Sequence, residues 1–342
     1  MKNNHIVVTG GGGYIGTTLV PILLEEGYRV TVIDRFFFGK ELLTINKNLK
    51  LVQEDSRKLR KEHFLNTFAV IDLVAISNDP SGELYSKATY QINRDSRVRT
   101  AKLAKDMGVQ RYILPSSCSI YGFTEGNVVS DETSITNPLT VYAKANEEAE
   151  KGVLKLSDSN FCVTVLRQAT VYGYSPRMRF DLAINGMTYG AWQNRKIPLM
   201  RDGNQWRPMI HVIDTARAQL FFLKQGSKII NNQIFNVGSD SGNYRIKDLA
   251  KIVKDAVGID ISIEWYGDPD HRSYKISFNK LAKLGFTSKF DAKDGVIEII
   301  QKLNSGELKK TERSITLDWY NKLNYWHNKI KKIELHDGIL DI

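Results

Sequence analysis

The sequence predicts an α/β fold in which a doubly wound parallel sheet is followed by a smaller C-terminal α/β lobe. Three observations support this fold class. Short β-branched runs alternate with helical patterns through the first half of the chain, a glycine-rich turn joins the first run to the first helix, and polar residues follow the ends of several runs. Such alternation gives a parallel sheet with right-handed crossovers, and ligands bind outside the carboxyl ends of its strands.

The elements of the predicted sheet follow one another in order. Short apolar runs predict strands at 5–8, 29–33, 49–52, 69–75, 111–115 and 162–167. Helical periodicity is clearest at 14–26, 91–107 and 141–156. Beyond Gly173 the less regular pattern predicts strands at 209–212, 234–237 and 261–265, helices at 214–224 and 246–257, and a loop at 267–272. We expect residues 1–173, rejoined by 209–240, to form a nucleotide-binding domain, and 174–208 with 241–342 to form a substrate lobe.

The first turn carries the most informative motif, Thr9-Gly-Gly-Gly-Gly-Tyr-Ile-Gly16. Glycines there let the backbone turn tightly and approach a phosphate, which the amides at the start of the next helix would face. A glycine turn in some other α/β protein is the alternative. The strand before, the helix after and an acid about 20 residues on favour a dinucleotide-binding Rossmann domain. The residues expected at the phosphates are Gly10, Gly13, Tyr14, Ile15 and Gly16.

The acid is Asp34, which closes the second predicted strand. A carboxylate at this place accepts hydrogen bonds from the adenosine ribose hydroxyls and repels a 2′-phosphate, which favours NAD over NADP. Arg35 is the competing signal, because an arginine nearby can hold a 2′-phosphate. We expect NAD.

Composition bounds the function. The chain of 342 residues has ordinary apolar and charged content, and it contains no run of 18 apolar residues, which argues against a membrane span. The first strand begins almost at once, so we expect no signal peptide. Cys118 and Cys162 are the only cysteines, which suggests a reducing compartment and a cytoplasmic protein. Six scattered histidines lack ligand spacing, so we expect no metal.

The net charge of +10 permits a nucleic-acid surface. However, the lysines near the C-terminus alternate with apolar residues at helical spacing, which is typical of the solvated face of a surface helix. The positive balance would also attract a nucleotide diphosphate. We therefore expect a small-molecule partner rather than nucleic acid.

Two further residues suggest proton transfer. Ser117 follows the predicted strand 111–115, and Tyr142 opens the helix 141–156. A tyrosine facing a hydroxyl at a strand end can take or give the proton of a sugar alcohol while the serine aligns the substrate oxygen. A cofactor that accepts hydride would complete an oxidation. Considered one at a time, Tyr142 is better explained as a half-buried aromatic and Ser117 as a turn residue.

At this point the chain resembles a known family, the extended short-chain dehydrogenase/reductases. The resemblance rests on the glycine motif, on Ser117 four residues before Tyr121-Gly122, and on Tyr142. Further matches, in order along nearly the whole chain, include Ile76-Ser-Asn-Asp-Pro80, Val171-Tyr-Gly173 and Gln205-Trp-Arg-Pro208. The pattern is similar to the nucleoside-diphosphate-sugar epimerase/dehydratase branch, which implies NAD in the Rossmann domain and a nucleotide sugar in the C-terminal lobe.

The resemblance also implies roles for individual residues. Those expected to contact the cofactor beyond the glycine turn and Asp34 are Asp55, Ser56, Val74, Ala75 and Asn93. Those expected to contact the substrate are Cys118, Ser119, Thr170, Asn185, Arg207 and Arg272. The arginines suit a diphosphate because their planar forks donate two parallel hydrogen bonds. Relatives commonly form homodimers through the helices that correspond to 91–107 and 141–156.

The main departure from the family pattern is Asn146, which stands where the family has a lysine four residues after the tyrosine. Residues i and i+4 share one helix face, so that ammonium can hold the nicotinamide ribose and lower the tyrosine pKa. Lys144 points roughly 200° around the helix and cannot easily substitute. Three accounts stay open: another cation from the substrate lobe serves instead, the enzyme works slowly or differently, or the substitution impairs turnover.

A second departure concerns the reaction. The sugar 4,6-dehydratases follow the serine or threonine with an Asp-Glu pair, whereas this chain has Cys118-Ser119, which disfavours that reaction. Cys118 is more typical of a packed residue than of a nucleophile. Thr170 stands where many relatives have asparagine, which blurs the sugar specificity.

The sequence therefore predicts an NAD-dependent nucleotide-sugar epimerase or dehydrogenase that oxidises the sugar C4 hydroxyl by hydride transfer to NAD, with Tyr142 as base. Ser117 and Asn146 complete the expected catalytic set. The alternative is a catalytically impaired protein that binds NAD and a nucleotide sugar, because Asn146 replaces the lysine. The identity of the sugar and the choice between epimerase and dehydrogenase are left open.

Overall fold

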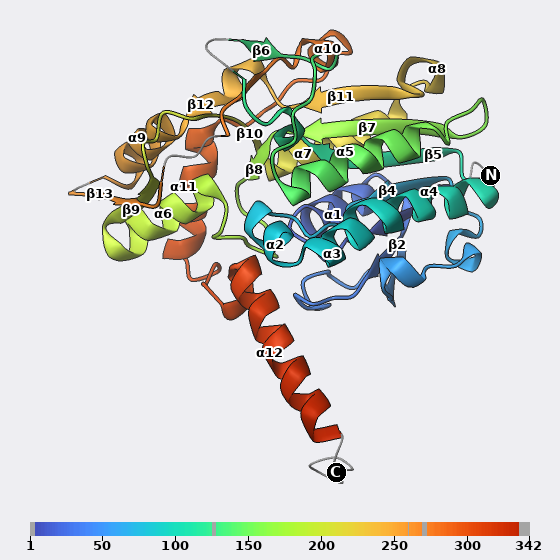
Figure 1. The fold of residues 1–342 in the computed structure, drawn as a ribbon, viewed down its shortest axis with the longest axis horizontal. Helices are drawn as coiled ribbons and strands as arrows, with labels where there is room; N and C mark the ends of the chain where they lie inside the picture. The colour runs from blue at the N-terminus through green and yellow to red at the C-terminus, as the bar shows by residue number, and fades with distance from the viewer. Residues whose placement is uncertain (1–3, 125–127, 259, 269–271, 335–342) are drawn as a thin grey trace.

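The computed structural model describes residues 4–124, 128–258, 260–268 and 272–334. A central sheet flanked by helices forms the main body, and a second group of helices and short strands packs at one end (Figure 1). The helix α12 (Thr316–Glu334) extends away from both. The expected two-part α/β architecture is confirmed.

The main sheet has seven strands, and every pair is parallel. In spatial order the strands are β11 (Gln233–Val237), β7 (Cys162–Gln168), β5 (Arg111–Ser117), β4 (Ala69–Asp72), β1 (His5–Thr9), β2 (Arg29–Asp34) and β3 (Leu49–Gln53). The strand order reverses at β1, which pairs with β4 on one side and β2 on the other. In a doubly wound sheet, ligands bind at such a reversal.

Helices cover both faces because successive strand residues point to opposite sides. Ile6 and Val8 belong to a buried cluster with the helices α1 (Gly16–Glu25) and α7 (Val212–Lys224), whereas Val7 belongs to a cluster with the opposite layer. That layer consists of α4 (Arg97–Asp106) and α5 (Val141–Leu154). The side chains of Ile6, Val7 and Val8 are fully buried.

The chain between β4 and α4 departs from a single helix. It forms α2 (Asp79–Leu84), α3 (Ser86–Thr89) and a π-helical segment, Tyr90–Ser96, before α4 begins. The helix expected over 91–107 is therefore corrected: its first part has the wider π geometry, which often occurs at functional sites. Short helical turns elsewhere are Ser56–Lys58, Lys61–Phe64, Cys118–Tyr121, α8 (Ser227–Ile230), Asp240–Gly242 and Glu312–Ser314.

The second group of elements has its own core. Its helices are α6 (Ala183–Asn194), α9 (Ile246–Val257) and α11 (Ala292–Asn304), whereas α10 (Asn279–Lys283) contacts β11 and contributes Leu281 to the buried cluster of the main sheet. One short sheet has β10 (Trp206–His211) between β12 (Asn243–Arg245) and β8 (Thr170–Tyr172). Two others pair β13 (Ser262–Tyr266) with β9 (Lys196–Met200), and β14 (Lys275–Ile276) with β6 (Val129–Ser130). Ile184, Leu249 and Val296 pack together from α6, α9 and α11. The four sheets thus join segments far apart in the sequence.

Most expected elements occur within one to three residues of their predicted bounds, and the differences are as follows. The strand expected to reach Ala75 ends at Asp72, and the helix expected over 14–26 spans Gly16–Glu25. The strand expected at 209–212 is β10, which lies in a small sheet rather than the main one. In the expected loop 267–272, residues 269–271 lie outside the described residues.

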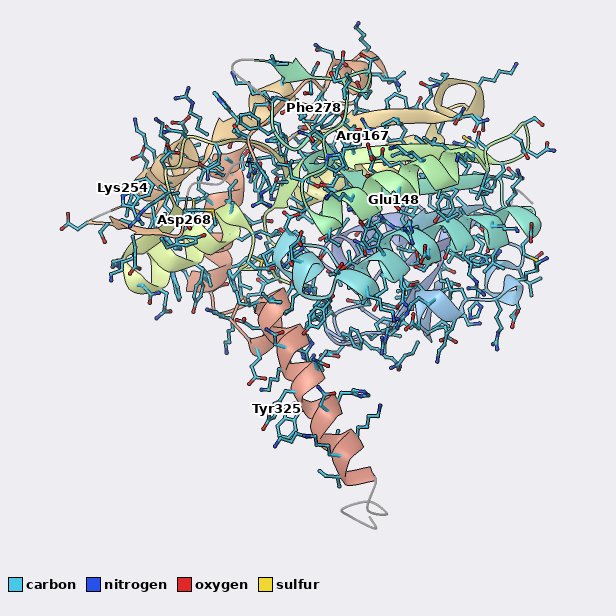
Figure 2. All side chains as sticks on the ribbon, viewed as in Figure 1. Glu148, Arg167, Lys254, Asp268, Phe278 and Tyr325 are labelled. Carbon is cyan, nitrogen blue, oxygen red and sulfur yellow. The ribbon has the colours of Figure 1, made fainter. Side chains whose placement is uncertain are left out.

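The C-terminal helix touches the body only near its start. Trp319 donates a hydrogen bond from Nε1 to the Phe37 carbonyl (2.7 Å), and Tyr320 packs against Phe37 and Phe38 in the segment after β2. Tyr325 lies on the part of α12 that extends away from the body, and half of its surface is exposed (Figure 2). Within the described ranges, no helix is long and apolar enough to span a membrane.

Candidate cofactor and active site

The β1–α1 turn forms a cradle that only glycine fits. Gly10 has φ +72°, and a Cβ there would lie 2.7 Å from the backbone of Leu73 and Val74 after β4. A Cβ on Gly16 would lie 2.4 Å from the Gly11 carbonyl oxygen. No side chain caps the start of α1 at Ile15. The turn therefore packs tightly on the β4 end and leaves the helix N-terminus open to an anion.

Asp34 ends β2 beside this turn. One carboxylate oxygen accepts a hydrogen bond from the Gly12 amide (3.0 Å), and the other accepts one from the Phe36 amide (2.7 Å). Burial raises the pKa of Asp34, and the amide hydrogen bonds counteract that increase. Arg35 is exposed, and its Nη1 lies 3.3 Å from a carboxylate oxygen of Asp55. The carboxylate, not the arginine, thus lines the glycine turn.

The remaining residues expected at the cofactor surround the ends of β3 and β4. Asp55 caps the turn that begins at Ser56, and hydrogen bonds from Arg57 hold the Asp55 pKa at about 2. The Ser56 and Ser96 hydroxyls lie 3.0 Å apart. Val74 and Ala75 are half-buried in the segment after β4.

Asn93 fixes the segment that follows Ala75. Its side-chain oxygen accepts a hydrogen bond from the Ile76 amide (2.8 Å), and its side-chain nitrogen donates to the Ile76 carbonyl (3.0 Å). Asn93 is fully buried in the π-helical segment. The side chain therefore acts here as a clamp on the backbone beside the expected cofactor site.

Sequence reasoning did not assign Arg177, which lies near the same turn. Its backbone amide donates to the Thr17 hydroxyl, its guanidinium stacks 3.6 Å above the Phe38 ring, and Nη2 donates to the Thr316 hydroxyl (2.9 Å). Nε and Nη1 are buried and have no hydrogen-bond partner among the described residues. Burial lowers the Arg177 pKa to about 9. A buried cation with two unused donors beside a glycine cradle fits an anionic group.

Tyr14 and Asn185 join the two parts of the molecule. The Tyr14 hydroxyl donates to the Gly173 carbonyl (2.6 Å), and the Asn185 side-chain nitrogen donates to that hydroxyl (3.1 Å). The Asn185 oxygen accepts from the Gly173 amide (3.0 Å). Both side chains are buried, and burial raises the Tyr14 pKa. An expected cofactor residue and an expected substrate residue are therefore in direct contact.

The structure brings Ser117 and Tyr142 together. Ser117 is the last residue of β5, and Tyr142 lies in the first turn of α5, which Thr140 caps by accepting a hydrogen bond from the Ala143 amide (3.2 Å). Burial raises the pKa of the Tyr142 phenol, whereas the charge of Arg97 and a hydrogen bond with Ser117 lower it. The paired hydroxyls are arranged for proton transfer with a substrate alcohol.

Asn146 does not stand alone on α5. Its side-chain nitrogen donates to the Tyr142 carbonyl (3.0 Å), and its oxygen accepts from Nη1 of Arg97 (2.8 Å). Asn146 and Arg97 are both buried, whereas Lys144 is exposed. Arg97 belongs to the layer of α4, and sequence reasoning missed it. Its position four residues after Asn93 was the available signal, since the two share a helix face.

Cys118 and Ser119 follow Ser117 in a short helical turn. The Cys118 thiol is buried, donates to the Arg167 carbonyl (3.3 Å), and has a pKa raised by burial. A buried thiol with a raised pKa is a packed residue rather than a nucleophile. The Ser119 hydroxyl is buried without a hydrogen-bond partner among the described residues, and Thr170 is half-buried in β8.

Arg207 and Arg272 meet on the substrate side. Arg207 donates a hydrogen bond from Nη1 to the Arg272 carbonyl, and Arg272 forms an ion pair with Asp79 at the start of α2. Asp79 in turn accepts from the Thr140 hydroxyl (2.6 Å), the cap of α5. The two arginines are thereby linked to the element that carries Tyr142.

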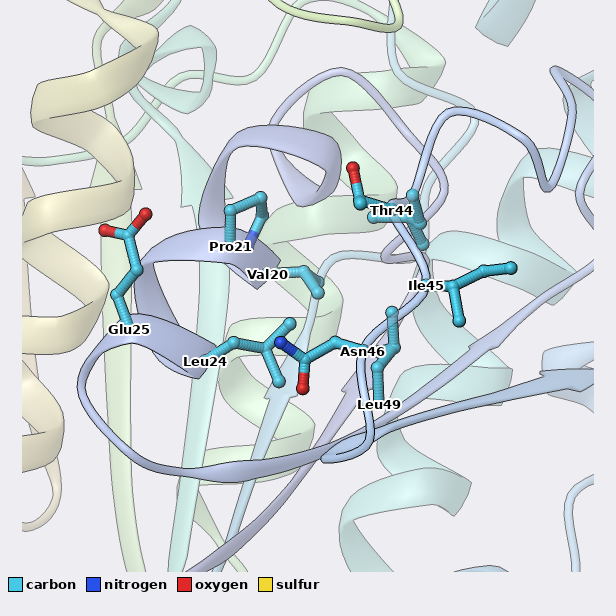
Figure 3. A pocket seen from close by; sticks show the side chains of 9 residues that line it. Val20, Pro21, Leu24, Glu25, Thr44, Ile45, Asn46 and Leu49 are labelled. Atoms are coloured by element: carbon cyan, nitrogen blue, oxygen red, sulfur yellow. The ribbon is translucent and has the colours of Figure 1, made fainter.

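A separate surface hollow lies elsewhere. It has a volume of about 320 Å³ and lies between α1 and the loop that leads into β3 (Figure 3). Its lining includes Pro21, Leu24 and Leu49. Leu24 is near the C-terminal end of α1 and Leu49 begins β3, so the hollow lies toward the amino ends of the strands, away from the side chains above.

Comparisons with known proteins agree with this fold. The model of the NAD dependent epimerase/dehydratase family matches residues 6–238. The chain is 29% identical over 322 residues to a putative UDP-arabinose 4-epimerase 2 from Arabidopsis thaliana, covering 82% of this chain and 76% of the relative. The structure is similar to UDP-glucose 4-epimerase with UDP-glucose from Thermotoga maritima, with TM-score 0.80 and 23% identity, covering 89% of this chain and 100% of that one. It is also similar to the dTDP-glucose 4,6-dehydratase DesIV from Streptomyces venezuelae with NAD and TYD bound, with TM-score 0.80 and 21% identity over 89% and 99% of the chains.

Proposed function

The chain belongs to the NAD-dependent epimerase/dehydratase family and its cofactor is NAD; from this premise we propose that it is a nucleotide-sugar 4-epimerase. The observation that carries the proposal is the Ser117–Tyr142 pair at the carboxyl end of β5, in the same sheet edge as the glycine cradle. The similarity to UDP-sugar 4-epimerases supports C4 as the reacting carbon.

The residues at the first turn suit the cofactor. The tight turn at Gly10 and Gly16 would hold a pyrophosphate against the start of α1, where no side chain of the described residues caps the helix. Asp34 would accept the ribose hydroxyls, and the two unused donors of Arg177 would pair with phosphate oxygens. We place Asp55 and Ser56 at the adenine and the segment of Val74 and Ala75 along the cofactor, with Asn93 fixing that segment from behind.

The chemistry follows from the phenol and its neighbours. When bound, NAD supplies the hydride acceptor and donor that the oxidation and reduction of the sugar need. Tyr142 takes the proton of the C4 hydroxyl, and Ser117 donates a hydrogen bond to the same oxygen. Tyr142 returns the proton when the alcohol forms again. Because the phenol pKa is raised by burial, a nearby positive charge is needed to favour its ionised form.

The substrate lobe would hold the rest of the nucleotide sugar. Arg207 and Arg272 suit the diphosphate, which would compete with Asp79 for Arg272. Asn185, Ser119 and Thr170 complete the proposed substrate contacts. Cys118 and Ser119 provide no acid and base for the elimination of water, so a 4,6-dehydratase is disfavoured although such enzymes share the fold.

The rival is a protein that binds NAD and a nucleotide sugar without efficient turnover. Its support is Asn146, whose oxygen and amide nitrogen already bond Arg97 and Tyr142 and which carries no charge. We favour the enzyme because Arg97 brings a cation to the same place. We further propose that residues 1–173 with 209–240 form the cofactor domain, that the protein is cytoplasmic, and that it dimerises through the outer surfaces of α4 and α5.

Mass spectrometry and an isomer assay together test the proposal. We expect purified protein to carry or bind NAD and to interconvert the C4 epimers of at least one UDP-sugar in a panel of hexoses, pentoses and uronic acids. NAD binding with sugar binding but no interconversion would favour the rival. Accumulation of a keto sugar with stoichiometric NADH would indicate a dehydrogenase. Absence of NAD binding by calorimetry would contradict both readings.

A further inference from the structure

We propose that Arg97 supplies the positive charge that the family pattern places on a lysine at position 146, and that Asn146 is the side chain that holds this guanidinium in place. The proposal rests on the proposed function, since it names the cation that serves Tyr142. It makes Arg97 and Asn146 one unit built from two elements 49 residues apart in the sequence. Arg97 is here a positioning residue that acts through Tyr142.

The guanidinium of Arg97 is fixed by three oxygen atoms from three elements. Nη1 donates to Oδ1 of Asn146 on α5 (2.8 Å), and Nη2 donates to the carbonyls of Asp72 at the end of β4 (2.9 Å) and Pro115 in β5 (2.7 Å). Arg97 is only 2% exposed. A planar fork with fixed donors suits this arrangement, whereas an ammonium on a flexible stem does not.

These partners place the charge at the functional edge of the sheet. Asp72 is the last residue of β4, and Pro115 is two residues before Ser117 in β5. The Nε atom of Arg97 is buried and has no hydrogen-bond partner in the described part of the chain. The guanidinium therefore lies among the strand ends near Tyr142, and its Nε–H group is unused.

The identity of residue 146 follows from this neighbour. Asparagine is short and offers an oxygen, so it can accept from Arg97 while its nitrogen bonds the Tyr142 carbonyl in the preceding turn. A lysine at 146 would bring a second cation against a buried guanidinium, and like charges in a buried site repel strongly. Lysine at 146 and arginine at 97 are thus alternatives that exclude each other.

Three charged groups and one hydroxyl act on the phenol from different parts of the chain. Arg97 on α4, Arg179 before α6 and the Ser117 hydroxyl on β5 lower the Tyr142 pKa, whereas burial and Asp79 on α2 raise it. Arg97 has the largest lowering effect among them.

The decisive measurement is the Tyr142 pKa in the parent and three variants, without cofactor or sugar. The protein is labelled with 13C at the tyrosine Cζ, and the Tyr142→Phe variant assigns the signal. We expect Arg97→Met to raise the Tyr142 pKa by about one pH unit or more, because it removes an opposite charge from a buried site. Adding Asn146→Lys to Arg97→Met should lower it again. The control Arg99→Met removes an exposed arginine from the same helix and should leave the pKa unchanged.

Stability provides a second arm in case Arg97→Met does not fold. We expect Asn146→Lys alone to lower the melting temperature, and the same substitution in the Arg97→Met background to raise it. A Tyr142 pKa that does not respond to Arg97→Met would overturn the proposal. So would an Asn146→Lys single variant that melts no lower than the parent and turns over faster.

The test separates this inference from the proposed function. The Tyr142 titration needs no substrate, so a response to Arg97 in a protein that interconverts no sugar would uphold the pairing and reject the epimerase. Sugar interconversion by a protein whose Tyr142 ignores Arg97 would give the opposite result. In active protein, Arg97→Met should lower kcat more than it raises KM, and the double variant should recover part of the loss.

Discussion

The cofactor half and the proton-transfer half of the site are built in different ways. The glycine cradle, the open start of α1 and Asp34 all come from 26 consecutive residues, 9–34, and they act mainly through the backbone. The proton-transfer half draws on Ser117 from β5, Tyr142 and Asn146 from α5, and Arg97 from α4. The cofactor half is local and acts mainly through main-chain atoms, whereas the proton-transfer half is assembled from side chains that are far apart in the sequence.

This difference explains where each half tolerates change. The turn does not tolerate a side chain at Gly10 or Gly16, because neighbouring backbone atoms fill the space that a Cβ would take there. An assembled set of side chains can keep its chemistry while its members change places, provided that the same charge reaches the same point. Asn146 with Arg97 is such an exchange in our proposal.

The largest effect on turnover is expected at Tyr142, in the proton-transfer half of the site. Tyr142→Phe should reduce turnover by about 10²- to 10⁴-fold, because it removes the group that takes the proton. NAD binding by calorimetry should change little, since the cradle is untouched. Tyr28→Phe serves as the control, because Tyr28 lies directly before β2 and belongs to neither half of the site. A variant with turnover within threefold of the parent would show that another group is the base.

The second prediction concerns Gly10, in the cofactor half of the site. Gly10→Ala should lower the free energy of unfolding by about 1 to 3 kcal/mol, because alanine is strained at positive φ and its Cβ meets backbone atoms. Denaturant unfolding and NAD titration measure both consequences.

Gly27→Ala is the matched control for this substitution. Gly27 has φ +82°, but a Cβ there has nothing within 4 Å, so only the conformational strain remains. We expect Gly27→Ala to bind NAD like the parent and Gly10→Ala to bind it at least about tenfold more weakly, which corresponds to 1.4 kcal/mol. Equal NAD affinity in the two variants would argue against a phosphate at this turn.

The third prediction concerns the side chain that closes the local half. Asp34→Ala should weaken NAD binding by about ten- to a hundredfold, the value of a hydrogen bond to a charged acceptor. The affinity for NADP should fall less or rise, because the carboxylate no longer repels a 2′-phosphate and Arg35 is nearby. Parallel titrations with both dinucleotides measure the ratio. An unchanged ratio would place the adenosine ribose elsewhere.

The smallest effect is expected at Cys118. Its thiol is buried and bonds a carbonyl, and Cys118→Ser keeps a donor at that position. Turnover should stay within about threefold of the parent, because the residue packs rather than reacts. Thiol modification of the native protein should be slow for the same reason. A loss of a hundredfold in kcat with unchanged KM would assign the thiol a chemical role.

The two halves also differ in how far the sequence predicts them. The fold class, the glycine turn after the first strand and the place of Asp34 at the end of the second strand follow from β-branched runs and spacing, which are local signals. The predicted strand 69–75 extends three residues beyond the end of β4 at Asp72, because long-range contacts set that end. The Asp72 carboxylate accepts hydrogen bonds from the hydroxyls of Thr9 (2.6 Å) and Tyr112 (2.5 Å). No local pattern shows such partners.

The assembled half was only partly predictable. Motifs in the sequence point to Ser117 and Tyr142. Arg97, in contrast, lies inside the predicted helix 91–107, which the family resemblance assigns to a dimer surface. A cation from the substrate lobe was one account of Asn146, and Arg179 does lower the Tyr142 pKa from that side. The larger contribution comes from α4, because the π-helical segment and α5 pack together and bring Arg97 to Asn146. Spacing along one helix cannot reveal a partner on another.

The contact between α12 and the segment after β2 makes Trp319 an intrinsic fluorescence probe of the cofactor site. The Trp319 indole bonds the Phe37 carbonyl two residues beyond Arg35, and Arg313 bonds the Phe38 carbonyl (3.0 Å). Indole emission depends on its immediate surroundings, so occupation of the adenosine side should alter the fluorescence of this tryptophan. Stopped-flow mixing could then follow cofactor exchange in unlabelled protein, with Trp319→Phe as the reference that reports the signal of the other four tryptophans.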